Sequence, residues 1–251
     1  MSAGVLLEVV GDGVACLTLN RPDALNALNR TMADGFEAAF ARLGMLSDTR
    51  VLLVEGRGRA FCAGNDIAEM EHLDSSDAEA ISRRWAMIMD RFSTLPQVTL
   101  AVIDGHALGG GLMLAVAQDL RIASDRARFG LPEVTLGFNP GYGIARLLDV
   151  AGGNHGRDLL LTGRSVHATE ALRMGLVNRV VAPPTLGETA RTWAAEIARS
   201  PRDGLAATKE IVAGIRAGRL GREPEAYGAA LRTGAAARAR IRAFVERKHR
   251  R

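Results

Sequence analysis

Apolar and polar positions follow two different periods along the first two thirds of the chain. Short apolar runs predict a pair of strands within 5–20, around the turn Gly11-Asp12-Gly13, and further strands within 49–58 and 98–111. Helical spacing marks 30–45, 77–95 (ending before Pro96) and 112–123, and the loop 60–70 leads into another helix. Strands that alternate with helices predict an α/β layered architecture.

The pattern changes near residue 150. Helical periodicity marks 155–163, 167–176, 185–200, 203–218 and a last segment from about 223, whereas 127–143 is short, extended and rich in turn residues. A helical tail with apolar faces must bury them on the body of the protein or on a neighbouring subunit, so we expect self-association.

Composition is typical of a soluble globular protein and excludes several other classes. The 251 residues are 47% hydrophobic and 24% charged. Cys16 and Cys62, the two cysteines, allow no disulfide framework, so we expect a reducing cytoplasm. The most apolar window, 98–117, is too short and too interrupted by polar residues to span a bilayer. Carboxylates and histidines are scattered without ligand spacing, so we expect no metal.

The net charge of +4 is concentrated at the C-terminus. Residues 238–251 are rich in arginine and form either a solvated helix with a basic end or an anion-binding surface. Composition favours the solvated helix. Aromatic residues make up 4% of the chain and do not interleave with the basic ones, so we expect no nucleic-acid partner.

Two loops share one design, in which a strand leads through glycines into a helix. They are 61–67, Phe-Cys-Ala-Gly-Asn-Asp-Ile, and 105–113, which contains Gly109-Gly110-Gly111. A helix N-terminus presents unpaired N–H groups, and glycine lets a ligand approach them. Two such ends facing each other would make an oxyanion hole, although the same turns also serve simply to pack helices on sheets. Neither loop matches a dinucleotide or Walker fingerprint.

Five segments in this order resemble the crotonase superfamily, the enoyl-CoA hydratase/isomerase family. They are 21–28 (RPDALNAL), 60–70 (AFCAGNDIAEM), 101–143 (containing GHALGGGLM and FGLPEVTLGFNPGYG), 159–181 (LLLTGRSVHATEALRMGLVNRVV) and 241–248 (IRAFVERK). The resemblance covers nearly the whole chain. It implies a crotonase-like fold of stacked ββα units at 1–190 and a helical C-terminal trimerisation region at 191–251. It also implies a homotrimer or a dimer of trimers.

The resemblance further implies a coenzyme A thioester as substrate, with no separate cofactor. The family's two oxyanion-hole N–H groups fall on Asn65 and Gly110. The lining of the coenzyme A channel falls on Ala24, Leu25, Ala63, Asp66 and Ile67. Lys209 and the C-terminal basic residues would meet the phosphates of coenzyme A. Local pattern alone gives Asp66 the role of a helix cap.

The family's two acidic positions are only half filled. Enoyl-CoA hydratases of this family carry a glutamate after the glycine turn, where this chain has Met113, and a second one matched by Glu133. A methionine packs but moves no proton. One carboxylate suffices to move a proton from the α to the γ carbon of a thioester, so we expect a Δ3–Δ2 enoyl-CoA isomerase with Glu133 as the single acid/base.

Several alternatives stay open from sequence. The protein would be a hydratase or hydroxyacyl-CoA lyase if another group, such as Tyr142 or a water, replaced the missing acid, or a non-catalytic acyl-CoA binder. Met113, Phe138 and Tyr142 are expected to shape the acyl pocket, although Asn139 and Tyr142 would serve equally as turn residues. Cys62 is interpreted as a small buried residue rather than a nucleophile, and His106 as a packing or hydrogen-bonding residue.

Overall fold

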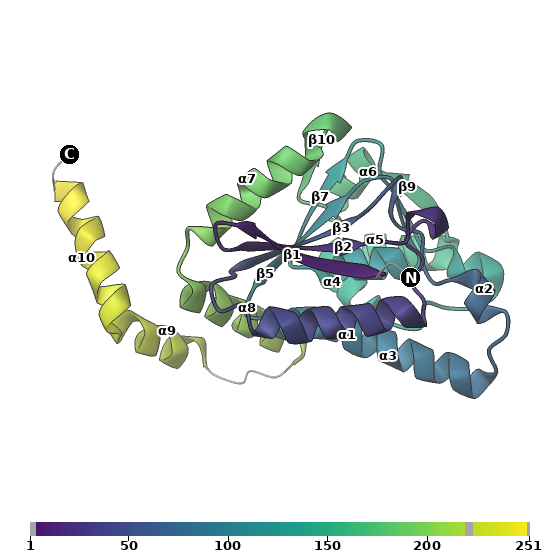
Figure 1. Cartoon of the computed structure of the whole chain (residues 1–251), viewed down its shortest axis with the longest axis horizontal. Helices are drawn as coiled ribbons and strands as arrows, with labels where there is room; N and C mark the ends of the chain where they lie inside the picture. The colour runs from purple at the N-terminus through teal and green to yellow at the C-terminus, as the bar shows by residue number, and fades with distance from the viewer. Residues whose placement is uncertain (1–3, 219–222, 250–251) are drawn as a thin grey trace.

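The computed structural model describes residues 4–218 and 223–249, and within them the chain forms two β-sheets covered by helices (Figure 1). The larger sheet has six strands in the order β1-β2-β3-β5-β7-β10. Their bounds are Val5–Gly11, Val14–Leu19, Val51–Gly56, Val98–Ile103, Leu120–Ser124 and Arg179–Val181. The predicted hairpin is present as the antiparallel pair β1–β2, and the other neighbours are parallel. The mixed α/β class is confirmed.

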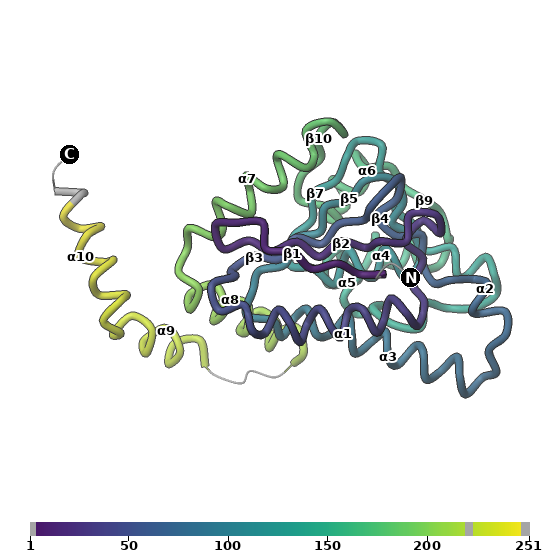
Figure 2. Tube along the Cα trace, in the orientation of Figure 1, coloured from purple at the N-terminus to yellow at the C-terminus, as the bar shows by residue number. Residues whose placement is uncertain are grey.

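Helices cover both faces of this sheet because its strands alternate two apolar sets. Val51 and Leu53 of β3 belong to one buried cluster, which α7 (Leu186–Ala198) completes with its alanines. Leu52 and Val54 belong to the other cluster, which α1 (Arg30–Gly44) and α3 (Ser75–Thr94) complete. Figure 2 shows α7 on one side of the sheet and α1 and α3 on the other. A strand buried on both faces reads as a continuous apolar run, as β3 does.

The smaller sheet positions the residues of interest. Its strands β4 (Ala60–Cys62), β6 (His106–Leu108) and β8 (Arg128–Gly130) are parallel neighbours, and β9 (Ser165–His167) pairs antiparallel with β8. Parallel neighbours end at the same edge of a sheet. The segments that follow β4, β6 and β8 carry Asn65, Gly110 and Glu133, so three segments distant in sequence meet there.

The helix predicted over 112–123 is wrong in its second half. Helix α4 spans Gly110–Ala117, and β7 begins at Leu120. All residues of α4 are buried, which matches its uninterrupted apolar sequence. Gln118 and Asp119 separate helix from strand: Asp119 accepts hydrogen bonds from the N–H and hydroxyl of Thr99, which fixes β7 beside β5. An apolar run of this length does not by itself distinguish a buried helix from a buried strand.

The remaining elements connect the layers and form the C-terminal part. Helices α2, α5, α6 and α8 span Ile67–Met70, Ile144–Thr162, Ala168–Arg173 and Arg202–Arg216. Short 3₁₀ helices η1, η2 and η3 span Pro22–Ala24, Pro132–Leu136 and Pro183–Thr185. Helices α9 (Pro224–Thr233) and α10 (Ala235–His249) extend away from the body, and α10 contacts α9 (Figure 1).

The predicted division at 190/191 falls inside α7. Ala194 and Ala198, beyond that position, are part of the sheet's buried cluster. The isolated chain leaves Ile241, Phe244 and Val245 of α10 exposed. The assignment of 191–251 to oligomerisation stays a prediction. None of the helices within the described residues has the length and apolarity that a membrane span requires.

Candidate active site

A cleft lies beside the carboxyl ends of β4, β6 and β8, with about 490 Å³ of space between its walls, part of it open to solvent. Its lining brings together most of the predicted site residues: Ala63, Asn65, Ile67, Gly110, Met113, Glu133, Phe138 and Tyr142. Met70, Leu136 and Pro140 also line it and were not predicted from sequence. Two of these three are ordinary apolar residues and the third is a turn proline, so their local pattern carries no signal for a site.

The backbone geometry and close contacts of the turn before α4 require glycine at positions 109 and 111. Gly109 has φ +50°, a conformation that disfavours side chains, and its N–H donates to the carbonyl of Gly130 at 2.9 Å. A Cβ at position 109 would lie 2.7 Å from Oε1 of Glu133. At Gly111 a Cβ would overlap the carbonyl of Cys62. These glycines therefore let α4 approach both β4 and the carboxyl group of Glu133.

Glu133 is held in an environment that disfavours its charge. Glu133 is the second residue of η2 and is 9% exposed. Its Oε2 atom has no hydrogen-bond partner among the described residues. Burial raises the pKa of this carboxyl, and a hydrogen bond from its own backbone N–H offsets part of that effect. Among the described residues that line the cleft, Glu133 is the one carboxylate. A buried carboxyl oxygen without a partner, facing a cleft, is typical of a proton-transfer group.

Met113 forms another part of the cleft wall. It is 1% exposed and packs against the backbone of Gly143, where a Cβ would lie 2.8 Å from the methionine sulfur. Gly143 has φ +81° and precedes the first turn of α5. The thioether is therefore fixed between α4 and the start of α5, and it offers the cleft only an apolar surface.

Asn65 and Tyr142 form a polar pair beside the first turn of α4. The Tyr142 hydroxyl donates to Oδ1 of Asn65 at 2.6 Å. Both side chains lie against Gly110, where a Cβ would overlap each of them. Burial raises the pKa of Tyr142, so the hydroxyl stays protonated at neutral pH and keeps its role as donor. Tyr142 thus anchors the loop after β4 to the loop before α5.

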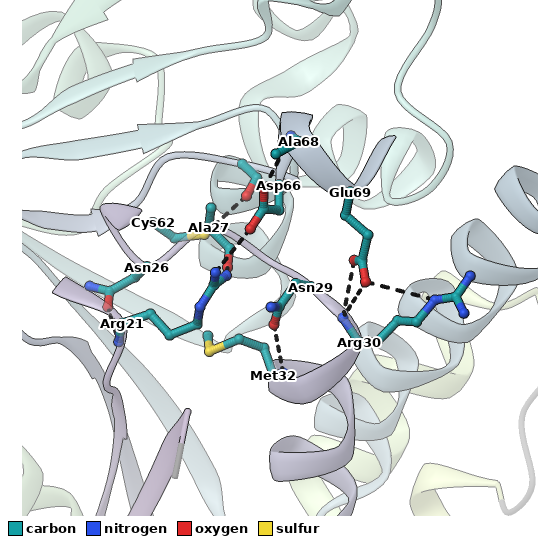
Figure 3. Close-up of polar contacts among 11 residues, drawn as sticks. Arg21, Asn26, Ala27, Asn29, Arg30, Met32, Cys62, Asp66, Ala68 and Glu69 are labelled. Carbon is teal, nitrogen blue, oxygen red and sulfur yellow. Dashed lines mark hydrogen bonds and ion pairs between the residues drawn. The ribbon is translucent and has the colours of Figure 1, made fainter. Parts of the chain in front are cut away.

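The loop after β4 is also fastened to the segment 21–30 (Figure 3). The Asp66 carboxylate accepts from the Arg21 guanidinium at 2.9 Å, and its other oxygen accepts from the Ala68 N–H at 3.2 Å. Asp66 is therefore the N-cap of α2, as predicted. The side-chain amide of Asn26 donates to the carbonyl of Ala60 at 2.8 Å.

Three predicted substrate-binding residues lie outside the cleft lining. Asp66 is occupied by the contacts above, and Leu25 accepts a backbone bond from Ala63 at 3.0 Å while adopting φ 51°. Ala24 ends η1. The segment that carries Ala24 and Leu25 thus borders the cleft through Ala63. Their roles toward coenzyme A stay predictions.

The prediction that Lys209 meets the phosphates of coenzyme A is wrong. Lys209 is 7% exposed, and its ammonium group donates to the Gln97 carbonyl at 2.7 Å and pairs with the Asp119 carboxylate at 2.7 Å. A buried ammonium with these partners ties α8 to the large sheet and has no access to a solvent-borne phosphate. Sequence pattern does not distinguish such a lysine from an exposed one.

The interpretation of Cys62 as a small buried residue is confirmed. Cys62 is fully buried, and burial raises the pKa of its thiol to about 12, which leaves no thiolate for nucleophilic attack at neutral pH. Asn139 donates to the carbonyl of the next residue, Pro140, at 2.9 Å, and its role as a turn residue stays a prediction. His106 is an exposed residue of β6. Within residues 4–218 and 223–249, no three His, Cys, Asp or Glu side chains gather in a metal-binding arrangement.

Comparisons with known proteins find similarity to enoyl-CoA hydratases along nearly the whole chain. Residues 10–246 match the family model for enoyl-CoA hydratase/isomerase. The chain is 37% identical over 220 residues to a probable enoyl-CoA hydratase of Mycolicibacterium paratuberculosis, covering 86% of this chain and 85% of that relative. It is 36% identical over 210 residues to a short-chain-enoyl-CoA hydratase of Clostridium acetobutylicum, covering 83% and 80%.

Solved structures give the same result for the fold. An enoyl-CoA hydratase from Bacillus anthracis superposes with a TM-score of 0.89 at 31% identity, covering 97% of this chain and 96% of that one. An enoyl-CoA hydratase of Mycobacterium smegmatis superposes with a TM-score of 0.89 at 29% identity, covering 98% and 97%.

Proposed function

Because the chain belongs to the enoyl-CoA hydratase/isomerase family, we propose that this acyl-CoA enzyme isomerises Δ3-enoyl-CoA to Δ2-enoyl-CoA with Glu133 as its single acid/base. The observation that carries the proposal is the pairing of Glu133 with Met113 in one cleft. Glu133 is buried with one unpartnered oxygen, and the side chain facing the cleft at the other acidic position of the family is a thioether.

The backbone N–H groups of Asn65 and Gly110 are the proposed oxyanion hole. Asn65 follows β4, Gly110 opens α4, and both line the cleft that contains Glu133. A thioester oxygen between them would receive two hydrogen bonds and the positive end of the α4 dipole. Each such donor contributes about 3 kcal/mol to the stabilisation of an enolate.

The proton transfer needs one group acting twice. The Glu133 carboxylate takes a proton from C2 of the 3-enoyl thioester, and the electrons move into the dienolate, whose oxygen is held by the two N–H groups. The protonated Glu133 then returns the proton to C4, the C3–C4 double bond becomes C2–C3, and the carboxylate is restored. The raised pKa of Glu133 suits this task because it brings the carboxyl nearer to the basicity of an enolate carbon.

The second candidate is hydration, and two observations favour it. The relatives described above are named as hydratases, and the protonated Tyr142 hydroxyl lines the same cleft as Glu133. In that reaction Glu133 would take a proton from water as the water oxygen adds to C3, and the protonated Glu133 would then give that proton to C2 of the resulting enolate. Tyr142 would orient that water, although its hydroxyl is already engaged with Asn65.

Product analysis separates the two. The purified protein is given a 3-enoyl-CoA in one reaction and crotonyl-CoA in another, and the product masses and double-bond positions are measured. The proposal expects 2-enoyl-CoA of unchanged mass from the first and no gain of water in the second. Formation of a 3-hydroxyacyl-CoA from crotonyl-CoA would contradict the proposed isomerisation and support hydration.

The variant that isolates Glu133 is Glu133→Gln, which keeps the shape and removes the base. Loss of one acid/base is worth on the order of 10²- to 10⁴-fold in kcat. We expect a loss of at least this size with little change in the affinity for a saturated acyl-CoA. If Glu133→Gln retained turnover, the assignment of Glu133 would be overturned.

The assembly we propose is a homotrimer or a dimer of trimers. Helix α10 carries exposed Ile241, Phe244 and Val245 and extends away from the body, an arrangement that suits contact with a neighbouring subunit. Light scattering of the full chain measures the mass directly, and a monomer at micromolar concentration would contradict this assembly. A cytoplasmic location stays a prediction.

A further inference from the structure

A second and larger space lies behind the candidate active site. It is a groove of about 1960 Å³, part of it open to solvent, bounded by α3, α5 and α8. Two residues, Met113 and Tyr142, line both the groove and the cleft that contains Glu133. They therefore stand between the two spaces as a partition.

The groove exists because α8 presents small residues to it. Ala206, Ala213 and Gly214 of α8 line it together with Ala217, which follows the helix, and Ala86 of α3 and Ala145 of α5 add two more small side chains. Charged side chains, among them Asp90 and Arg146, also line it, and these two pair with each other at 3.0 Å. The space has room for a chain of methylene groups beyond the partition.

The partition is rigid on both sides. Met113 is 1% exposed and is packed against the backbone of Gly143, which has φ +81° and tolerates no larger residue without strain. Tyr142 is 8% exposed and is fixed by its 2.6 Å hydrogen bond to Asn65. Neither side chain swings aside without losing a packed or hydrogen-bonded position.

We propose that Met113 and Tyr142 limit the length of the acyl group, so that the enzyme accepts short acyl chains and excludes long ones from the groove. This inference rests on the proposed acyl-CoA site, where the thioester lies between Asn65, Gly110 and Glu133. An acyl chain that continues past Glu133 toward α3 and α8 meets the thioether and the phenol ring. The replacement of an acid by methionine thus changes the substrate range as well as the proton chemistry.

Binding of saturated acyl-CoAs tests the proposal without any turnover. Calorimetry with butyryl-, hexanoyl- and decanoyl-CoA is run on the full chain. Each buried methylene strengthens binding where the pocket accommodates it. We expect the affinity of the parent to stop increasing beyond hexanoyl-CoA, and Met113→Ala to bind decanoyl-CoA about tenfold or more tightly than the parent does.

Two control variants separate opening of the partition from general loosening. Met89→Ala removes a methionine that is also buried but lines only the groove, so it should leave the affinity profile of the parent unchanged. Tyr142→Phe keeps the ring and leaves Met113 in place but removes the bond to Asn65, so it should relax the length limit less than Met113→Ala does. An equal gain in decanoyl-CoA binding from Met113→Ala and Met89→Ala would overturn the proposal.

The parent protein alone also decides the question if Met113→Ala does not fold. Decanoyl-CoA binding that is more than about tenfold tighter than hexanoyl-CoA binding to the parent would show an unobstructed chain and overturn the partition. The result is independent of the reaction. A protein that failed to isomerise 3-enoyl-CoA but kept the length limit would refute the proposed function and leave this inference standing.

Discussion

Glu133 opposes the stability of the fold when it is ionised. Burial raises the pKa of this carboxyl in the folded chain, so the folded state favours its protonated form. The resulting contribution to stability is full below the ordinary glutamate pKa of about 4.3 and is lost as pH rises through the higher folded pKa. The buried, ionised carboxyl of Glu133 therefore lowers the stability of the folded protein at neutral pH.

Glu133→Gln should consequently stabilise the protein at neutral pH while abolishing turnover. The variant should have a higher Tm than the parent at pH values above the folded pKa of Glu133, and the same Tm as the parent at pH values below the ordinary glutamate pKa. Thermal scans of parent and variant across that pH range measure the difference. A constant difference at all pH values would mean that the charge of Glu133 is not the cause.

The same pKa shift predicts the acid limb of the rate profile. In the proposed isomerisation Glu133 must be a carboxylate to take the C2 proton, so kcat/KM should fall as pH is lowered through the raised pKa. The midpoint should lie above the ordinary glutamate value, because desolvation is the first cause of the shift. A rate profile for 3-enoyl-CoA that stays flat down to the ordinary glutamate pKa would contradict a buried Glu133 as base.

Helix α2 depends on one cap that also fastens the site loop. Asp66→Ala removes the cap of α2 and the ion pair with Arg21, at an expected cost of about 1 kcal/mol in the free energy of unfolding. Asp74→Ala is a matched control, because Asp74 is the N-cap of α3 and its carboxylate accepts a hydrogen bond from the Asp77 N–H at 2.8 Å. Urea unfolding should give similar losses for both, whereas KM for the acyl-CoA should rise only for Asp66→Ala. If Asp66→Ala and Asp74→Ala had the same KM for the acyl-CoA, the loop after β4 would have no role in substrate binding.

Sequence pattern predicted elements well where the period was clear and poorly where glycines interrupted it. The hairpin and helices α1 and α3 lie where they were expected, because their apolar faces repeat regularly. Helix α5 begins at Ile144, whereas the predicted helix covered only 155–163. The first half was missed because Gly152 and Gly153 interrupt the helical pattern, and Gly152 adopts a non-helical φ of 74°. Strands β8, β9 and β10 have three residues each, too few to show alternation.

Sequence predicted the site residues that lie on loops after predicted strands. It did not predict the features of the site that depend on long-range packing. Asn65, Gly110 and Glu133 share the cleft because their strands are neighbours in one sheet, and the ordered motifs indicated this. The partition between two spaces depends on how α4, α5 and α8 approach one another. Helix approach is determined by side-chain packing across the whole molecule, which a single sequence does not reveal.

The Lys209–Asp119 pair joins the C-terminal helices to the large sheet. Lys209→Met leaves the Asp119 carboxylate with only its Thr99 contacts, so the free energy of unfolding should fall by about 2 kcal/mol. Adding Asp119→Asn to that variant should recover part of the loss, because the uncompensated charge is then removed. Urea unfolding of the single and double variants measures both. If Lys209→Met had parent stability, the pair would not anchor α8.

The proposed isomerisation requires one carboxyl group to carry one proton from C2 to C4, and isotope labelling measures this transfer directly. The purified protein is given 3-enoyl-CoA deuterated at C2, in ordinary water, and the position of deuterium in the early product is read by mass spectrometry and NMR. A single buried base predicts that part of the deuterium reappears at C4 of the 2-enoyl-CoA. A product in which all of the transferred deuterium is lost to solvent, or no conversion at all, would contradict proton transfer by Glu133 alone.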